Sequence, residues 1–266
     1  MTQKTNPPIA FLPSYVGSKR RWLPELGHLA SRPIAELFAG SGIISSTYAS
    51  RALLVDTDEM LTRALSRFDE LIVPDEFTVS DYETVRGAEG WWRYSYYLAA
   101  MSRGGIWRWS NKGGFNIQPR NHKTKQLRED YEVALDRWRE LQPDVRCDSY
   151  ANVADPEIEA VGGRTTIAVF DPPYEKTAAQ YNRSGFNYPA YWQRVAETSS
   201  RFETVIFDTA ENLTRAGYEV AATKTMSGIG TKKAGTEGIS IVRPRIPLQT
   251  LYLVVITAIL RALAVR

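Results

Sequence analysis

The chain has 266 residues, of which 43% are hydrophobic, enough for one large core or for one core with a smaller lobe. The single cysteine, Cys147, excludes an internal disulfide framework, and one thiol with two histidines argues against a structural zinc site. The first residues lack the long apolar core of a secretory signal. We therefore expect a soluble, globular, cytoplasmic protein without a metal.

The first part of the chain predicts two strands, each followed by a helix. Residues 33–38 (PIAELF) predict a buried strand, the tight turn AGSG follows, and a helix begins near residue 43. Residues 51–56 (RALLVD) predict the second strand, and residues 57–72 predict a helix with one apolar face. That face consists of Met60, Leu61, Ala64, Leu65, Phe68, Leu71 and Ile72.

The segment from Trp91 to Arg128 is both basic and aromatic. It holds eight Lys or Arg, eight aromatic residues and no Asp or Glu, so against a net charge of +3 the remaining residues sum to about −5. Basic side chains interleaved with aromatic ones suit a phosphate backbone with exposed bases. The alternative interpretation is a solvated loop with some core aromatics.

The rest of the chain completes an α/β pattern. Residues 126–141 predict a helix, residues 165–170 (TTIAVF) and 203–208 (ETVIFD) predict strands, and residues 218–226 with 237–242 predict a hairpin that closes the sheet. The apolar stripe of the helix consists of Leu127, Tyr131, Ala134, Leu135, Trp138 and Leu141. Strands alternating with helices indicate a mostly parallel sheet with crossover helices.

Three features lie where such a sheet binds ligands, outside the carboxyl ends of its strands. Gly40 and Gly42 let the backbone approach a ligand closely, Asp56 ends the second strand, where a carboxylate can bind two ribose hydroxyls, and Asp171 ends a third. The glycines do not follow the G-x-G-x-x-G pattern, because position 45 is Ser. A nucleoside-containing ligand without a pyrophosphate therefore fits better than NAD.

Seven motifs follow one another along the chain: FLPSYVGSK, ELFAGSG, LLVDTD, GGIWRWSNKGGFNI, CDSYAN, DPPY and SGIGTKKAGTEG. Together they resemble the Dam-type adenine-N6 DNA methyltransferases, from about Phe11 to Pro244. Their order matches the permuted group in which the target-recognition region is inserted between the cofactor and catalytic motifs. The tail from Arg245 has no counterpart; its apolar residues 251–265 are too few to span a bilayer and include Arg261, so we predict buried structure.

The resemblance implies an α/β fold with a Rossmann-like methyltransferase sheet, mostly parallel with a C-terminal antiparallel hairpin, and a small, mostly helical inserted lobe. The S-adenosylmethionine-binding catalytic domain would comprise residues 1–86 and 147–266, and the inserted target-recognition domain residues 87–146. The expected setting is the cytoplasm of a bacterial or phage-infected cell, with a restriction, phage or housekeeping role left open. The expected oligomeric state is a monomer or a weak dimer on DNA.

The resemblance also implies S-adenosyl-L-methionine as cofactor. Tyr15 stands where the family usually has a Trp near the methionine part, Lys19 matches a lysine near the cofactor, and Asp56 matches the ribose acid. The implied cofactor-binding residues are Tyr15, Gly17, Lys19, Glu36, Phe38, Gly40, Gly42, Asp56 and Asp171. The alternatives are an ordinary surface lysine for Lys19 and a helix N-cap for Asp56.

The DPPY corner holds the implied catalytic residues, Asp171, Pro172, Pro173 and Tyr174. The exocyclic amine of adenine is a poor nucleophile because its lone pair is delocalised into the ring. Asp171 and the carbonyl of Pro172 would accept its two hydrogens and direct the lone pair at the sulfonium methyl, while Tyr174 offers a ring face for stacking. Proline suits this corner because its fixed φ and missing N–H leave acceptors only.

The expected partner is double-stranded DNA with the target base flipped out of the helix. The candidate DNA-binding residues are Arg103, Arg108, Asn111, Lys112, Arg120, Lys123, Lys232 and Lys233. Arg108 matches a guanine-reading arginine, with a phosphate contact or stacking between its neighbouring tryptophans as the alternative. GATC is the favoured target, although Gly104 and Gln118 depart from the family's usual Asn and Pro. A cytosine-N4, RNA or protein-glutamine methyltransferase and a non-catalytic nucleic-acid-binding protein remain alternatives.

Overall fold

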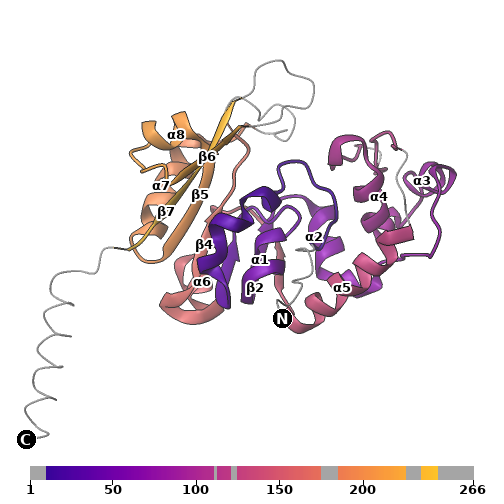
Figure 1. Cartoon of the computed structure of the whole chain (residues 1–266), viewed down its shortest axis with the longest axis horizontal. Coiled ribbons are helices and arrows are strands. Elements are labelled where there is room, and N and C mark those ends of the chain that lie inside the picture. The colour runs from indigo at the N-terminus through magenta and orange to yellow at the C-terminus, as the bar shows by residue number, and fades with distance from the viewer. Residues whose placement is uncertain (1–9, 111–112, 121–124, 175–184, 226–234, 245–266) are drawn as a thin grey trace, which may run out of the picture.

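The central feature of the fold is one seven-stranded sheet with the order β3-β2-β1-β4-β5-β7-β6 (Figure 1). The computed structural model describes residues 10–110, 113–120, 125–174, 185–225 and 235–244. The strands are β1 Arg32–Glu36, β2 Ala49–Asp56, β3 Asp144–Cys147, β4 Ile167–Phe170, β5 Glu203–Thr209, β6 Ala222–Thr225 and β7 Thr236–Val242. The first five run parallel, and β7 is antiparallel to both β5 and β6. The predicted Rossmann-like, mostly parallel sheet with its C-terminal antiparallel hairpin is confirmed.

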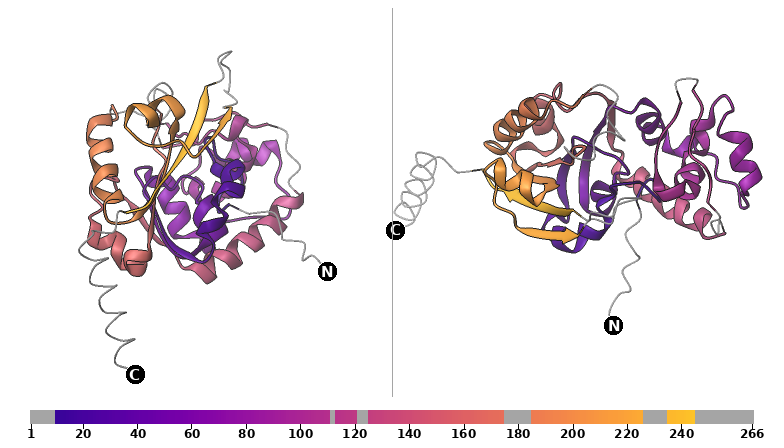
Figure 2. Two further views of the ribbon diagram at one scale, coloured as in Figure 1. Left: turned by 60° about the vertical axis from the view of Figure 1, so that its left-hand side comes forward. Right: turned by 90° about the horizontal axis from the view of Figure 1, so that it is seen from above.

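Helices cover both faces of this sheet (Figures 1 and 2). The α-helices are α1 Ile43–Tyr48, α2 Glu59–Ser66, α3 Val79–Val85, α4 Ser95–Met101, α5 Lys125–Leu141, α6 Asp155–Gly162, α7 Tyr188–Ser199 and α8 Ala210–Arg215. The 3-10 helices are η1 Lys19–Leu29, η2 Phe68–Glu70, η3 Trp91–Tyr94, η4 Arg103–Gly105 and η5 Gly163–Thr165.

Strands β2, β4 and β5 contain continuous apolar runs because both of their faces are buried. Leu54 packs with η1, α1, α2, α4 and α5 in one core, whereas Leu53 and Val55 pack with α6, α7 and α8 in a second core on the opposite face. Alternate residues of β5 divide in the same way, with Phe207 in the first core and Ile206 in the second. The period of two thus assigns each side chain of a strand to one layer of helices.

The predicted lobe of residues 87–146 contains η3, α4, η4 and the whole of α5, and much of it extends to one side of the sheet (Figure 2). Its helix α5 is bound to the sheet layer: Arg137 Nε donates to the carbonyl of Ser46 at 2.8 Å, and Trp138 Nε1 donates to that of Leu65 at 2.9 Å. The buried residues of lobe and sheet form one continuous core. The division of the chain into two domains therefore stays a prediction.

Two elements differ from the sequence-based expectation. The helix predicted for residues 57–72 ends at Ser66, because Arg67 leaves the helical region (φ −123°, ψ 44°), and η2 follows it; Ile72 is 37% exposed rather than part of the apolar face. Strand β3 was not predicted, and it begins at Asp144, inside the range assigned to the lobe. It pairs with β2 and so belongs to the sheet.

No helix in the described part of the chain has the length and apolar character needed to cross a membrane. The apolar residues 251–265, for which we predict buried structure, lie outside the described residues.

We expect Gly42→Ala to lower the free energy of unfolding by about 2–4 kcal/mol, measured by urea denaturation. Gly42 has φ 65°, and a Cβ there would lie 2.8 Å from Cδ2 of the buried Phe11 ring. Gly27→Ala is the control, because its φ is ordinary and no heavy atom lies within 4 Å of the added Cβ. Its effect should stay within about 0.5 kcal/mol. Equal effects for the two variants would contradict the role of this turn.

Candidate active site

The carboxyl ends of β2, β1 and β4 form one edge of the sheet and bring three of the predicted carboxylates into a row. Strand β2 ends at Asp56, its neighbour β1 ends at Glu36, and Asp171 directly follows β4. The chain leaving β1 continues between its neighbours, since Leu37 N–H donates to the carbonyl of Val169 and Ala39 N–H to that of Val55. The glycine turn therefore begins between the carboxyl ends of β2 and β4.

Asp56 is bonded to the glycine turn. Its Oδ2 accepts from Gly40 N–H at 3.1 Å and its Oδ1 from Asp58 N–H at 3.0 Å. Burial raises the pKa of Asp56 to about 6, although these backbone N–H groups favour the charged form. The N-cap of α2 is Asp58, whose side chain accepts from Met60 and Leu61, so Asp56 is not the helix cap of the alternative interpretation.

Glu36 is a buried carboxylate that faces the first turn of α1. Its Oε1 accepts from Ser45 N–H at 2.7 Å, and burial raises the pKa of its carboxyl to about 7. A contact between Glu36 and a ligand stays a prediction, since the observed partner is a helix backbone.

The turn itself is covered by an aromatic ring. Tyr15 lies so close to Gly40 (φ 50°) that a Cβ on the glycine would be 3.1 Å from Cε1 of the ring. Phe38, also predicted to contact the cofactor, stacks instead on Tyr150, with ring centroids 5.0 Å apart. Gly17 (φ 81°) contributes its carbonyl to Lys19.

Lys19 is buried in the protein, not an ordinary surface lysine. Its side chain is 5% exposed, and Nζ lies 2.6 Å from Asp171 Oδ2, 2.6 Å from the carbonyl of Gly17 and 3.5 Å from Glu237 Oε1. The residue begins η1, so this contact joins the N-terminal motif GSK to the DPPY corner. A lysine in this position supplies the local positive charge that a buried aspartate needs.

Asp171 is more accessible than Lys19 and Glu237, with 22% of its side chain exposed. Burial raises its pKa to about 6, against the attraction of Lys19, which favours the ionised form. The corner after it is held by Tyr188, whose hydroxyl donates to the carbonyl of Pro173 at 2.8 Å. Asp171 is thus ionised at neutral pH and has a fixed backbone beside it.

Tyr174 differs from the ring face that its motif suggests. Its side chain is buried, and its hydroxyl contacts Glu237 Oε1 and, at 3.4 Å, Asp171 Oδ1. The Lys19 ammonium lies 5.5 Å from the centre of the ring. Stacking of a base on Tyr174 therefore stays a prediction.

Sequence reasoning missed Glu237. Its Oε2 accepts from Arg21 at 2.6 Å and from Trp22 Nε1 at 2.5 Å, and its side chain is 6% exposed. Burial alone would raise its pKa, but Lys19 and the hydrogen bonds from Tyr174, Arg21 and Trp22 lower it below the usual value. The GTEG motif contained this residue, but the pattern of residues 237–242 indicated only a strand.

Three of the predicted DNA-binding residues, Arg103, Arg108 and Arg120, are exposed on the lobe. Arg108 Nε donates to Asn116 Oδ1 at 3.0 Å. The lobe contacts the sheet edge through Trp109, whose Nε1 donates to the Asp58 carboxylate at 3.1 Å. The other predicted DNA-binding residues lie outside the described residues: Asn111, Lys112, Lys123, Lys232 and Lys233.

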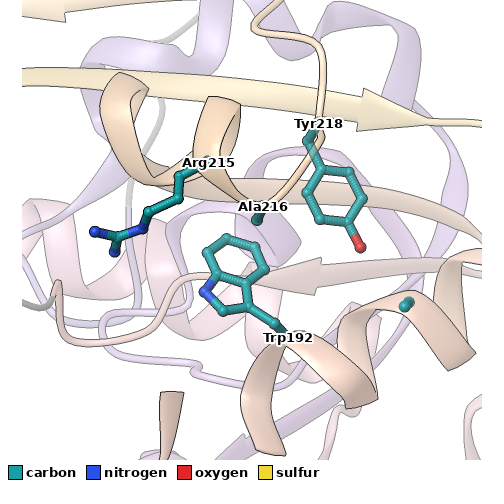
Figure 3. Close-up of a pocket in the computed structure, with 5 residues that line it drawn as sticks. Trp192, Arg215, Ala216 and Tyr218 are labelled. Carbon is teal, nitrogen blue, oxygen red and sulfur yellow. The ribbon is translucent and has the colours of Figure 1, made fainter. Parts of the chain in front are cut away.

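A separate pocket lies between α7 and the end of α8 (Figure 3). It is lined by Trp192, Ala196, Arg215, Ala216 and Tyr218. None of the predicted site residues contributes to it. Within the described chain, no group of three His, Cys, Asp or Glu side chains could hold a metal ion.

No protein-family model matches the chain, and no curated protein matches its sequence. Two solved structures of the rRNA methyltransferase aviRa from Streptomyces viridochromogenes are similar to it. One is 11% identical with a TM-score of 0.41 and covers 87% of this chain and 89% of that one. The other is 12% identical with a TM-score of 0.37 and covers 88% and 90%. Values this low say nothing about the reaction or the substrate of this chain.

We expect Lys19→Met to lower the free energy of unfolding by about 3–5 kcal/mol at pH 8, the usual cost of leaving a buried charge without its partner. Without the ammonium, the folded-state pKa of Asp171 rises further above its unfolded value, and the pKa of Glu237 loses the cation that helps to hold it below its usual value. The stability contributed by a group with a raised folded-state pKa is retained below the unfolded pKa and is lost as the pH rises through the folded pKa. The deficit relative to the wild type should therefore shrink at pH 5.

The control for this experiment is Lys224→Met. Lys224 pairs with Glu25 at 2.8 Å, but both side chains are partly exposed (26% and 32%), so the loss should stay below about 1 kcal/mol. Urea denaturation of both variants at the two pH values gives the comparison. A Lys19→Met deficit that did not depend on pH would contradict the ion pair.

Proposed function

We propose that the protein transfers a methyl group from S-adenosylmethionine to the exocyclic N6 amine of a flipped adenine in double-stranded DNA, with GATC as the favoured target. The observation that carries the proposal is the DPPY corner at the end of β4, where Asp171 is partly exposed and paired with Lys19 through one oxygen. The glycine turn and Asp56 lie along the same edge of the sheet. A nucleoside site and an amine acceptor are therefore neighbours.

The residues present fit the proposed cofactor. A carboxylate has about four lone-pair positions, and the two backbone N–H groups on Asp56 occupy one on each oxygen, so it can still accept from two ribose hydroxyls. Gly40 allows close approach of the backbone, and Tyr15 lies over the turn. When bound, S-adenosylmethionine supplies an electrophilic methyl group on a sulfonium.

The chain's own contribution is to orient the amine. The Asp171 carboxylate would accept one amine hydrogen and the carbonyl of Pro172 the other, which takes the nitrogen lone pair out of conjugation with the ring and directs it at the methyl group. Asp171 can accept only when ionised, and a pKa of about 6 leaves it ionised at neutral pH. Positioning and electrostatics then carry the catalysis, with no covalent intermediate on the protein.

The basic, aromatic lobe supports a nucleic acid as substrate. Arg103, Arg108 and Arg120 are exposed on it, as phosphate or base contacts require, while Trp91, Trp107 and Phe115 are buried and pack against one another. The lobe thus joins a surface of arginines to an aromatic support. A cytosine-N4 or RNA methyltransferase with the same corner is the second candidate, because the amine chemistry is shared.

The test is to incubate the protein with labelled S-adenosylmethionine and, separately, with random double-stranded DNA, RNA and protein, and to identify the modified nucleoside. We expect N6-methyladenine in DNA. Asp171→Ala should lower the turnover by a factor of about 10² to 10³, the typical cost of removing a preorganised electrostatic contact. Asp136→Ala, on the exposed face of α5, is the control and should retain wild-type turnover.

The outcomes of this experiment are distinct. Label in N4-methylcytosine or in RNA would favour the second candidate, and label in protein would favour a glutamine substrate. Binding of nucleic acid without transfer to any substrate would favour a non-catalytic protein. Retention of more than about a tenth of the turnover in Asp171→Ala would exclude the proposed role of this carboxylate.

We expect Arg108→Ala to weaken binding at the cognate site by about 1–3 kcal/mol and to relax the preference at one guanine, because a bidentate arginine is the commonest specific contact to that base. The measurement is the methylation profile on a randomised DNA library. Arg139→Ala is the control, since this residue is 59% exposed on α5 and was not predicted to contact DNA. Identical profiles for the wild type and Arg108→Ala would leave Arg108 with a phosphate contact only.

A further inference from the structure

Glu237 has two carboxylate oxygens with different surroundings. Oε2 faces inward and accepts from Arg21 and Trp22, whereas Oε1 faces Lys19 at 3.5 Å and the hydroxyl of Tyr174. The residue lies opposite Thr209 in the antiparallel pair of β7 and β5, at the carboxyl end of β5. A buried carboxylate thus stands directly behind the proposed catalytic corner without being part of it.

The hydroxyl of Tyr174 can donate only one hydrogen. It lies much closer to Glu237 Oε1 than to Asp171 Oδ1, from which it is 3.4 Å away, so the hydrogen goes to Glu237. Asp171 Oδ1 is left as an acceptor without this hydrogen, while Oδ2 is bonded to Lys19 at 2.6 Å. The two oxygens of Asp171 therefore differ: Lys19 binds Oδ2, and Glu237 draws the Tyr174 hydrogen away from Oδ1.

We propose that Glu237 is a positioning residue for the methyl transfer: it takes the Tyr174 hydrogen and shares the Lys19 ammonium, and so keeps Asp171 Oδ1 open to the substrate amine. This inference rests on the proposed function. Glu237 itself touches neither the substrate nor the reacting atoms, and it acts through Lys19 and Tyr174.

The charges around Asp171 determine how its titration responds to Glu237. Lys19 of η1 and Glu237 of β7 face it directly, Tyr174 follows it in the corner, and Glu36 of β1 lies along the same edge. Arg21 balances Glu237 from behind. Lys19 therefore lies between Asp171 and Glu237, and loss of the Glu237 charge would leave Asp171 as the only acid that forms an ion pair with Lys19.

The first experiment measures kcat, KM and the pH dependence of kcat for Glu237→Gln with a DNA substrate. We expect kcat to fall by about 10- to 100-fold, by analogy with the loss of a residue that orients a metal ligand, with a small change in KM. Because Lys19 then favours the ionised form of Asp171 more strongly, the pKa of Asp171 falls and the acidic limb of the profile moves to lower pH. If Glu237 had a purely structural role, the substitution would lower kcat at every pH and leave the acidic limb of the profile at the same pH.

The matched control is Glu203→Gln. Glu203 is also largely buried, with 14% of its side chain exposed, and pairs with Arg32 at 3.3 Å, but it begins β5 at the opposite end of the strand from the proposed site. Its kcat and its acidic limb should match those of the wild type.

A double variant tests the hydrogen-bond part of the proposal. In Glu237→Gln the weaker acceptor releases the Tyr174 hydrogen toward Asp171 Oδ1, where it competes with the substrate. Adding Tyr174→Phe removes that hydroxyl, so we expect the double variant to recover part of the lost kcat. A double variant slower than Glu237→Gln would overturn this part.

Should Glu237→Gln fail to fold, Arg21→Met gives an independent test with the opposite sign. The Arg21 side chain is 38% exposed, and its removal leaves Glu237 to hold Lys19 more strongly, so the acidic limb should move to higher pH. A wild-type protein that methylates no substrate would contradict the proposed function. If the wild type is active but the acidic limb of the kcat–pH profile does not move in Glu237→Gln, this inference alone would be overturned. Arg21→Met decides in the same way if it is the variant that folds.

Discussion

The ion pair between Lys19 and Asp171 is the contact on which the proposed site depends. It joins η1, near the start of the chain, to the end of β4, and Glu237 extends it to β7. Two buried charges with poor partners would cost more free energy than their attraction returns. Here the carbonyl of Gly17 bonds to Lys19, and the hydroxyl of Tyr174 and the guanidinium of Arg21 bond to Glu237, so the pair is retained with Asp171 still partly exposed.

The same end of the molecule holds the contacts that join the lobe to the sheet. Val16 N–H donates to the carbonyl of Gly105 at 2.8 Å, and a Cβ on Gly105 would lie 2.7 Å from Ser14 Oγ, so the loop that carries Tyr15 rests directly on the lobe. Trp109 bonds to Asp58, two residues after Asp56. The lobe is therefore in direct contact with the loop that carries Tyr15 and with the residues that follow Asp56.

The sequence predicted those parts whose chemistry is local. Strands β2, β4 and β5 contain apolar runs buried on both faces, α5 has a complete apolar stripe, and an acid followed by two prolines is readable without any structure. Strand β3 (DVRC) was missed because four residues with two charges carry no strand pattern, although pairing with β2 stabilises them. Glu237 was missed for a related reason: its importance comes from partners in η1 and in the DPPY corner, which only the β5–β7 pairing brings within reach.

The row of carboxylates at the carboxyl ends of the strands would favour a ligand that carries a positive charge. Burial raises the pKa of Asp56 and of Asp171 to about 6 and that of Glu36 to about 7, so each of these groups is less stable when ionised than it would be in water. S-adenosylmethionine carries a positive sulfonium. A cation beside ionised carboxylates favours their charged forms, so the same interaction that binds the cofactor would lower these pKa values. Binding of the proposed cofactor would therefore offset part of the cost of burying these charges, in addition to what Lys19 and the backbone N–H groups already offset.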